Sequence, residues 1–333
     1  MLNPESKLNT KLFDSNVEQQ SMRQGFGEGL LKAAELDKRV VGLCADLSES
    51  THMLEFQKRF PGRFVELGVA EQNLVTVASG MAAMGKIPFV SSYAVFSPGR
   101  NWEQIRTTIC YNDRPVKIIG SHAGLNVGPD GGSHQALEDM ALMRVLPRMV
   151  VISPCDSIEA RKATLEAAKT DQPTYIRLAR EKSPVMTTEG TPFEIGKAQI
   201  VFRPTEGKKL DAAIIATGAL LYKALRVAKD LETKGKHVSV MNLSTIKPLD
   251  EAGITKLARE AGCIVTVEEH QVAGGMGSAV AECLAANFPV PIEFVGVKDR
   301  FGQSGQPEEL IELYGIGEKA ILEAIHRVMV RKK

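Results

Sequence analysis

Two histidines and an aspartate lie close together around a glycine-rich stretch in the middle of the chain. His122 and His134 bracket the stretch Gly124–Gly132, which contains Asp130. Histidine suits general acid–base catalysis near neutral pH, so this spacing favours proton transfer in a polar pocket. The stretch lacks the Gly-Lys-Ser/Thr ending of a P-loop. His122 taken alone is equally typical of a buried, hydrogen-bonded core histidine.

Three further features elsewhere in the chain have side chains that could contribute to a functional site. Glu71 is an isolated carboxyl group at the start of an uncharged run that extends from Gln72 to Gly85. Tyr93 and Phe96 form an aromatic pair, and Arg180 follows an apolar run. Each has an ordinary structural explanation, because a carboxylate in a first helical turn stabilises the helix dipole, aromatic residues fill cores and arginines lie on surfaces. A functional site is indicated only if these residues lie together.

The elements that must position these residues alternate between short apolar strands and helical patterns. Strands are expected at Val40–Ala45, Phe64–Leu67, Ile87–Ser92, Val116–Ser121, Met149–Ser153 and Thr174–Leu178. Helices are expected at Val17–Leu36, Met53–Phe60, Glu71–Met84, Gly99–Cys110, Gln135–Leu146 and Ser157–Lys169. This alternation predicts βαβ units and a parallel, doubly wound sheet.

In open sheets of this kind, ligands bind beyond the carboxyl ends of the strands. The candidate residues follow the expected strands in this order: Asp46 and Ser50, Glu71, Tyr93 and Phe96, His122 with Asp130 and His134, and Arg180. The sequence therefore predicts that most of the candidate catalytic residues lie at one edge of one sheet.

The same pattern restarts after a stretch rich in Pro, Thr and Gly from Ser183 to Pro192, which we interpret as a linker. Strands are expected at Asp211–Ala216, His237–Asn242, Cys263–Glu268 and Ile292–Val297. Helices are expected at Leu220–Thr233, Asp250–Ala261, Gly277–Asn287, Glu308–Leu313 and Glu318–Val330. The length of 333 residues suits two domains. We expect two three-layer α/β domains, at residues 14–182 and 196–333, joined by a linker at 183–195; the second is the smaller.

The uncharged helix from Gln72 to Gly85 is apolar on every side and rich in small residues. Such a helix is buried on all sides, either in a core or at a large subunit interface, and we favour the interface.

Several functional classes are excluded by the sequence. There is no Gly-x-Ser-x-Gly elbow and no His-Glu-x-x-His zinc motif. Gly25-Phe-Gly-Glu-Gly29 lies within a helical pattern, so it is not a dinucleotide fingerprint. A net charge of +1 argues against nucleic acid as a partner, and no apolar run is long enough for a membrane span. Five unpaired-looking cysteines and no signal peptide predict a cytoplasmic protein.

Five segments, in this order and spacing, resemble the C-terminal half of the transketolase family. They are Cys44-Ala-Asp-Leu-Ser-Glu-Ser50, Glu66-Leu-Gly-Val-Ala-Glu-Gln-Asn73, Gly128-Pro-Asp-Gly-Gly-Ser-His-Gln135, Leu178-Ala-Arg180 and Asp299-Arg-Phe-Gly-Gln-Ser-Gly305. The resemblance implies a pyrimidine-binding domain that binds thiamine diphosphate, followed by a transketolase C-terminal domain.

The resemblance also implies roles by position. Glu71 matches the glutamate that bonds the cofactor's aminopyrimidine ring, and Tyr93 and Phe96 match the aromatic pair that packs on it. Asp46 and Val69 match the cofactor pocket. The implied catalytic residues are Glu71, His134 and His122. The implied substrate-binding residues, which hold the sugar's hydroxyls or grip its phosphate, are Arg23, Ser50, His122, Asp130, His134 and Arg180.

One departure from the family concerns the diphosphate. Transketolases bind the diphosphate and Mg²⁺ through a Gly-Asp-Gly motif, which this chain lacks. The resemblance therefore implies the C-terminal subunit of a split transketolase, whose N-terminal partner subunit holds the diphosphate and Mg²⁺, with self-association through the pyrimidine-binding domain. The implied reaction transfers a two-carbon ketol unit from a ketose phosphate to an aldose phosphate.

Two alternatives stay open. The β subunit of a thiamine-dependent 2-oxoacid dehydrogenase has a similar size and also carries a glutamate in this position. His134 and the phosphate-binding group argue against it, because decarboxylating a small oxoacid needs no phosphate contact. A non-catalytic regulatory subunit could keep the fold, but it would not need Glu71 and His134, which are both present.

Overall fold

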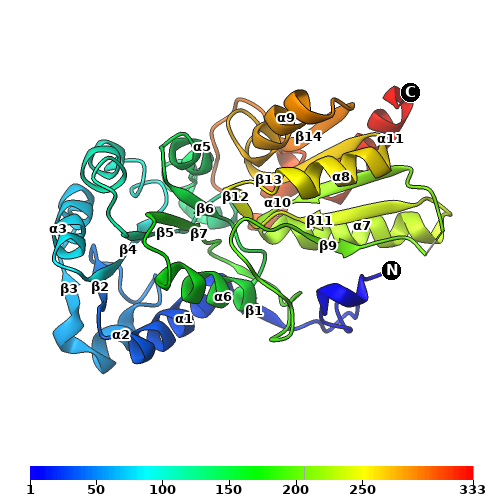
Figure 1. Ribbon diagram of the computed structural model, residues 1–333. Coiled ribbons are helices and arrows are strands. Elements are labelled where there is room, and N and C mark those ends of the chain that lie inside the picture. The colour runs from blue at the N-terminus through cyan, green and yellow to red at the C-terminus, as the bar shows by residue number, and fades with distance from the viewer. Residues whose placement is uncertain (206, 333) are drawn as a thin grey trace.

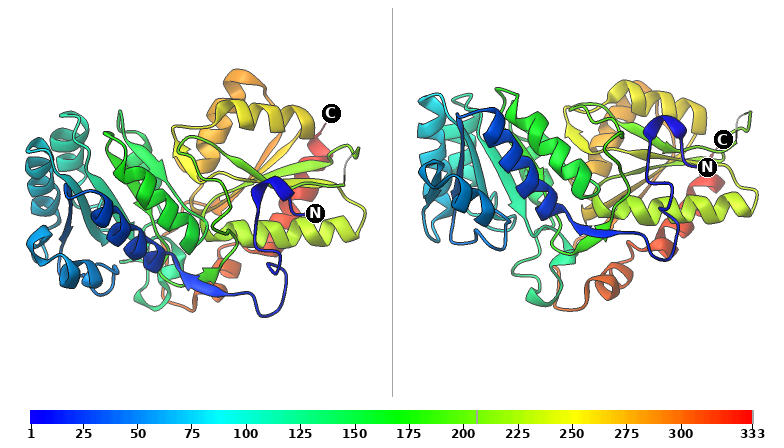
Figure 2. Two further views of the ribbon diagram at one scale, coloured as in Figure 1. Left: turned by 60° about the horizontal axis from the view of Figure 1, so that its bottom comes forward. Right: turned by 90° about the horizontal axis from the view of Figure 1, so that it is seen from below.

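The computed structural model describes residues 1–205 and 207–332, which form two α/β domains side by side (Figure 1). Glu206 and Lys333, both inside the expected second domain, lie outside the described residues. The first residues pack against the second domain before the chain crosses to the first, as Figure 2 shows. The Met1 ammonium donates to the Arg203 carbonyl oxygen at 2.5 Å. Leu8 and Leu12 are buried in the core of the second domain.

The first domain is built on a seven-stranded sheet of order β12-β6-β7-β5-β4-β2-β3. Six strands are parallel: β2 (Val40–Cys44), β3 (Phe64–Glu66), β4 (Ile87–Tyr93), β5 (Lys117–Ser121), β6 (Val150–Ile152) and β7 (Thr174–Arg177). They agree with the six expected strands. Apart from the edge strand β3, their middle residues are mostly apolar and buried, as both faces of a parallel sheet require.

Helices cover both faces of this sheet. One face is covered by α1 (Met22–Leu36), α2 (Leu54–Arg59) and α6 (Ser157–Ala168). The other is covered by α3 (Glu71–Ala83), α4 (Trp102–Gln104), the π-helical turn η3 (Ile105–Cys110) and α5 (Asp139–Arg144). This is the expected three-layer arrangement.

The glycine repeat of α1 serves helix packing. A Cβ at Gly25 would lie 1.8 Å from the Ser157 carbonyl oxygen, and one at Gly29 would lie 2.9 Å from the Arg161 carbonyl oxygen. Only glycine lets the backbones of α1 and α6 approach this closely. Helix packing thus explains the glycines at both ends of the Gly25-Phe-Gly-Glu-Gly29 run.

The second domain has a five-stranded sheet of order β14-β13-β10-β11-β9. Its strands are β9 (Gln199–Phe202), β10 (Ala212–Ala216), β11 (Val238–Asn242), β13 (Ile264–Gln271) and β14 (Ile292–Val297), and only β9 is antiparallel to its neighbour. The helices are α8 (Glu251–Ala261) and α9 (Met276–Asn287) on one face, and α7 (Leu221–Thr233), α10 (Pro307–Leu313) and α11 (Glu318–Arg331) on the other.

Two expectations for local structure were wrong. The helix expected from Val17 begins at Met22, where the Ser21 side chain accepts from the Arg23 amide, and the residues before it form β1 (Gln19–Ser21). That strand pairs antiparallel with β8 (Lys182–Pro184), which begins the stretch interpreted as a linker. The helix expected over 135–146 is confined to α5, because Gln135 is held by backbone carbonyls of the glycine-rich loop.

The two domains share a core and a sheet. Strand β12 (Thr245–Lys247) comes from the second domain, yet it pairs antiparallel with β6 of the first. A single apolar cluster joins Met140 and Leu146 of the first domain to Ile254 and Met276 of the second. Burial of this common surface fixes the domains relative to one another.

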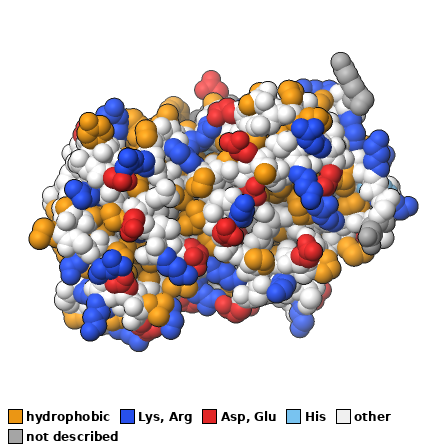
Figure 3. Space-filling model, viewed as in Figure 1, with side chains coloured by type: hydrophobic (Ala, Val, Ile, Leu, Met, Phe, Trp, Pro, Cys, Tyr) orange, Lys and Arg blue, Asp and Glu red, His pale blue; other side chains and the backbone are white. Residues whose placement is uncertain are grey.

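The surface carries charges of both signs. Figure 3 shows basic and acidic side chains interspersed over the face seen there. No helix within 1–205 or 207–332 combines the length and apolar character that crossing a membrane would need.

Candidate active site

Four rings gather at the carboxyl ends of β4 and β5. The ring of Tyr93, the last residue of β4, stacks on the ring of His122, which follows β5, with centroids 3.9 Å apart. Phe96 lies nearly parallel to Tyr93 at 6.3 Å, and His134 meets Phe96 edge-on at 5.4 Å. Adjacent parallel strands bring these residues together, as the sequence predicted.

His122 is the most buried of the four. Its Nδ1 lies 2.8 Å from Ser121 Oγ, and its Nε2 lies 3.5 Å from Arg23 Nη1. A guanidinium can only donate, so Nε2 is the acceptor and Nδ1 carries the proton. Burial first, and then the charges of Arg23 and Arg180, lower the pKa of His122 to about 3. The ring is therefore neutral near pH 7 and acts through hydrogen bonds.

Arg23 joins the residues expected to bind phosphate. Its Nη1 donates to the Ser50 carbonyl oxygen at 2.6 Å and its Nη2 to the Arg180 carbonyl oxygen at 2.7 Å. Burial, followed by the charge of Arg180, lowers the pKa of Arg23. Arg180 donates from Nη1 to the Val127 carbonyl oxygen at 2.6 Å, and its nearest carboxylate, Glu181, is 3.8 Å away. Two weakly compensated guanidinium groups favour an anion between them.

Glu71 opens α3, and its side chain is only 3% exposed. One carboxylate oxygen, Oε2, lies 2.9 Å from Nη1 of Arg100. The same guanidinium lies over the Phe96 ring, 4.7 Å from its centroid. Asn101 fixes the local backbone, because its side-chain amide donates to the Glu71 carbonyl oxygen at 2.8 Å. Glu71 is thus connected to the ring cluster through Arg100.

Three expected site residues have no direct contact with the cluster among the contacts described. Asp46 and Asp130 are exposed, and the Val69 side chain is 72% exposed. Asp46 and the segment leading to Val69 are instead held together by Glu66, whose Oε1 accepts from the amides of Asp46, Leu67 and Gly68. Asp46, Val69 and Asp130 therefore form an exposed rim at the sheet edge that carries the ring cluster.

The sequence reasoning missed two residues. Arg100 lies within an expected helix, and no sequence signal links it to Glu71. His52 follows Ser50 at the end of the first strand, and that position was the available signal. Burial and the charge of Arg23 lower the pKa of His52, and His52 in turn is one of the groups that lower the pKa of His122.

The second domain supports the loop that carries Asp130 and His134. Gln135 Nε2 donates to the Gln303 carbonyl oxygen at 3.0 Å. A Cβ on Gly132 would lie 2.5 Å from the Gly302 carbonyl oxygen, and Gly131, at φ 76°, would meet Ser304. Glycine is required at these positions because the two loops touch.

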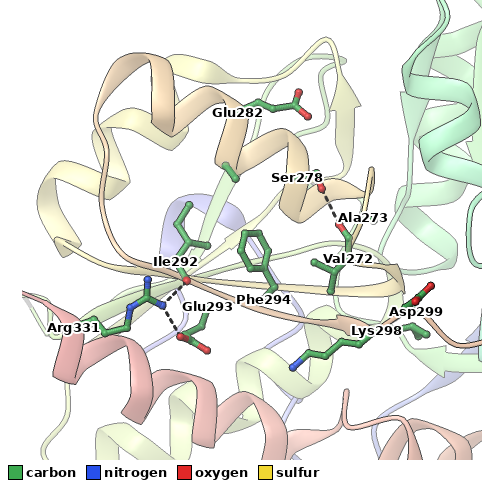
Figure 4. A pocket seen from close by; sticks show the side chains of 12 residues that line it. Val272, Ala273, Ser278, Glu282, Ile292, Glu293, Phe294, Lys298, Asp299 and Arg331 are labelled. Carbon is green, nitrogen blue, oxygen red and sulfur yellow. Dashed lines mark hydrogen bonds and ion pairs between the residues drawn. The ribbon is translucent and has the colours of Figure 1, made fainter.

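A groove of about 860 Å³ lies elsewhere, in the second domain between β14, α9 and the end of α11 (Figure 4). Half of the residues that line it are apolar, and Arg331 at one end donates to Glu293 at 2.6 Å. None of the candidate site residues lines it. Within residues 1–205 and 207–332, no group of three or more His, Cys, Asp or Glu side chains is placed to hold a metal ion.

Fold and site together define a two-domain α/β protein with a carboxylate and an aromatic cluster at one sheet edge. Residues 18–185 match the transketolase pyrimidine-binding domain, and residues 196–321 match the transketolase C-terminal domain. The chain belongs to the transketolase family.

Three similar proteins cover almost the whole chain. A 6-deoxy-6-sulfo-D-fructose transketolase subunit from Clostridium sp. (strain MSTE9) is 39% identical over 96% of this chain and 98% of that protein. A subunit of an apulose-4-phosphate transketolase from Phocaeicola vulgatus is 36% identical over 90% of this chain and 94% of that protein. The solved structure of a split gene transketolase, an inactive β4 tetramer, has a TM-score of 0.87 and 42% identity over 94% of this chain and 99% of that chain. The family and fold class expected from the sequence are confirmed.

Proposed function

We propose that this chain is the C-terminal subunit of a thiamine diphosphate-dependent transketolase, which moves a two-carbon ketol unit from a ketose phosphate to an aldose phosphate. The observation that carries the proposal is the buried carboxyl group of Glu71, connected to the Phe96 ring through Arg100, in a chain without Gly-Asp-Gly. The similarity to subunits of split transketolases supports it and disfavours a dehydrogenase β subunit or a regulatory subunit.

The residues present fit the pyrimidine half of the cofactor. A planar group that hydrogen-bonds at its edge can lie over Phe96 and bond Glu71 at the same time, because the Arg100 guanidinium makes both contacts. Thiamine diphosphate supplies an electron sink when bound. Glu71 would bond the aminopyrimidine ring nitrogen and share a proton with it, Tyr93 and Phe96 would pack against the ring, and Asp46 and Val69 would line the rim.

The remaining residues bind the sugar. Arg23, Ser50 and Arg180 bind the terminal anion, which positions the distant reacting carbons. Asp130 and His134 hold hydroxyl groups, and His134 moves protons during transfer. His122 contributes neutral hydrogen bonds, since its pKa is about 3.

We propose that the other half of the site comes from an N-terminal transketolase subunit that carries Gly-Asp-Gly and holds the diphosphate and Mg²⁺. We also propose self-association through α3, giving a heterotetramer in the cytoplasm. The outward positions of α3 include Gln72, Asn73, Gly80 and Ala83, all exposed and uncharged. We retain the domain boundaries 14–182 and 196–333, with a linker at 183–195.

The donor is proposed to be a sugar with a terminal anion. One relative is named for a sulfonated sugar and another for a sugar phosphate. Two guanidinium groups suit either anion, because each presents planar N–H donors to oxygen atoms.

The experiment is co-expression with a partner chain carrying Gly-Asp-Gly, followed by assays with thiamine diphosphate and Mg²⁺. The complex should transfer two-carbon units from ketose phosphates, and the chain alone should not. Turnover by the chain alone would refute the shared site. Activity with pyruvate and a lipoyl acceptor, and none with ketose phosphates, would assign the function to an oxoacid dehydrogenase.

A further inference from the structure

Arg100 makes two contacts that no catalytic or binding role yet explains. Its Nη1 lies 2.9 Å from Glu71 Oε2, and its Cζ lies 4.7 Å from the centroid of Phe96. The side chain is 51% exposed, whereas Glu71 is 3% exposed. A solvent-accessible cation has therefore bound the buried carboxyl group at the centre of the proposed cofactor site.

The two contacts match those proposed for the aminopyrimidine ring. Both groups are planar, both would hydrogen-bond the carboxyl group of Glu71, and both would use the face of Phe96 as the stacking surface. We propose that Arg100 is a placeholder: its guanidinium takes the position of the aminopyrimidine ring in the free subunit and must leave when the cofactor binds. This inference rests on the proposed function.

The surroundings allow the side chain to move while the backbone stays in place. The Arg100 amide donates to the Phe96 carbonyl oxygen at 2.9 Å, and the next residue, Asn101, is buried and bonded to the Glu71 carbonyl oxygen. These bonds fix the main chain. The guanidinium itself has only Glu71 as a hydrogen-bond partner among the contacts described, so a rotamer change releases it.

In the free subunit, Arg100 gives the buried carboxyl group of Glu71 a hydrogen-bond partner. A carboxylate as buried as Glu71 is costly without a partner, and Arg100 provides one until the cofactor arrives. Cofactor binding then exchanges one partner for another, and the lost Arg100 contacts subtract from cofactor affinity. A partly exposed ion pair and one cation–π contact together correspond to about a 3- to 30-fold change in affinity.

The test measures cofactor affinity of the reconstituted complex by titration calorimetry with thiamine diphosphate in Mg²⁺ buffer. Arg100→Ala and Arg100→Gln should lower Kd by about 3- to 30-fold relative to wild type, as the lost contacts imply. Arg106→Ala is the matched control, since Arg106 is an exposed arginine nearby in the chain, in the π-helical turn η3, and it should leave Kd unchanged. Circular dichroism checks that each variant is folded.

The possible outcomes distinguish the placeholder inference from the proposed function on which it rests. Weaker binding in both Arg100 variants would make Arg100 a cofactor contact and overturn the placeholder. An unchanged Kd, or an equal change in Arg106→Ala, would overturn it as well while the proposed function stands. A wild-type complex that binds no thiamine diphosphate would refute the function itself and the placeholder with it.

Discussion

At the scale of residues, the site combines one buried acid, three arginines and, in the ring cluster, two dissimilar histidines. Burial separates the roles of the histidines, because it lowers the pKa of His122 to about 3 and so keeps that ring neutral. The half-buried His134 bonds Ser133 Oγ at 2.9 Å and faces the edge of the aromatic pair. We therefore propose that His134 transfers protons and that His122 provides hydrogen bonds.

Glu71→Gln tests the activating role. The glutamine keeps the shape of the side chain and can still accept from Arg100, so the subunits should assemble normally. It lacks the acidic proton that Glu71 shares with the ring nitrogen, so exchange of the thiazolium proton should fall to the rate of the free cofactor. Exchange in D₂O, followed by NMR on the reconstituted complex, measures it. Exchange near the wild-type rate would remove Glu71 from the mechanism.

Arg180→Ala tests the anion-binding role. Loss of one charge-assisted contact should cost about 1.5–3 kcal/mol, or roughly 10- to 150-fold in KM for ketose phosphates. Use of hydroxypyruvate, which has no terminal phosphate, should barely change. Arg180 also donates to the Val127 carbonyl oxygen at 2.6 Å, so a purely structural role would reduce kcat/KM for both donors equally. Arg180→Lys is the control that keeps the charge without the planar pair of donors.

At the scale of elements, the helix α3 has two different sides. Its inward side, including Leu74, Val75 and Ala78, is buried in the core shared by the domains. Its outward side carries no charge, and a Cβ added at Gly80 would have no atom of this chain within 4 Å. A glycine in an exposed helix costs about 1 kcal/mol relative to alanine, which suggests that a close neighbour is expected at this position.

Gly80→Ala therefore distinguishes a free surface from an interface. If the face is free, alanine should stabilise the chain by about 0.4–1 kcal/mol and leave its association unchanged. If another backbone packs there, as we propose, alanine should weaken the oligomer, and Gly80→Glu should give monomers. Sedimentation velocity over a range of concentrations measures the association. Unaltered oligomers with Gly80→Glu would exclude this face as the interface.

Much of the fold and part of the site could be predicted from the sequence, because the patterns that indicate them lie within short stretches of the chain. Buried strands such as β5 read as apolar runs, and the residues just after them, such as His122 and Arg180, reach one sheet edge by topology alone. The Arg100–Glu71 pair did not follow, because it depends on side-chain packing between segments 29 residues apart. Strand β12 was missed because three residues pairing with another domain leave no periodic pattern.

At the scale of the whole molecule, the two domains form one structural unit. Besides β12 and the shared core, a buried ion pair joins Arg177 to Asp139 at 2.8 Å, and Arg177 also donates to the Glu269 carbonyl oxygen at 2.9 Å. Asp139 in turn accepts from Tyr175 at 2.7 Å. The second domain thus contacts both the strands and the loop that carry the candidate site residues.

This coupling predicts that both domains unfold in one transition, which Ile325→Ala can test. Ile325 is fully buried on α11 in the core of the second domain, whereas Trp102, the only tryptophan in the chain, belongs to the first. Truncating a buried isoleucine should cost about 2–5 kcal/mol. Because the core and sheet are shared, the thermal transition reported by Trp102 fluorescence should fall by as many degrees as the one reported by far-ultraviolet circular dichroism. A Trp102 transition that stays at the wild-type temperature while the other moves would show that the domains unfold independently.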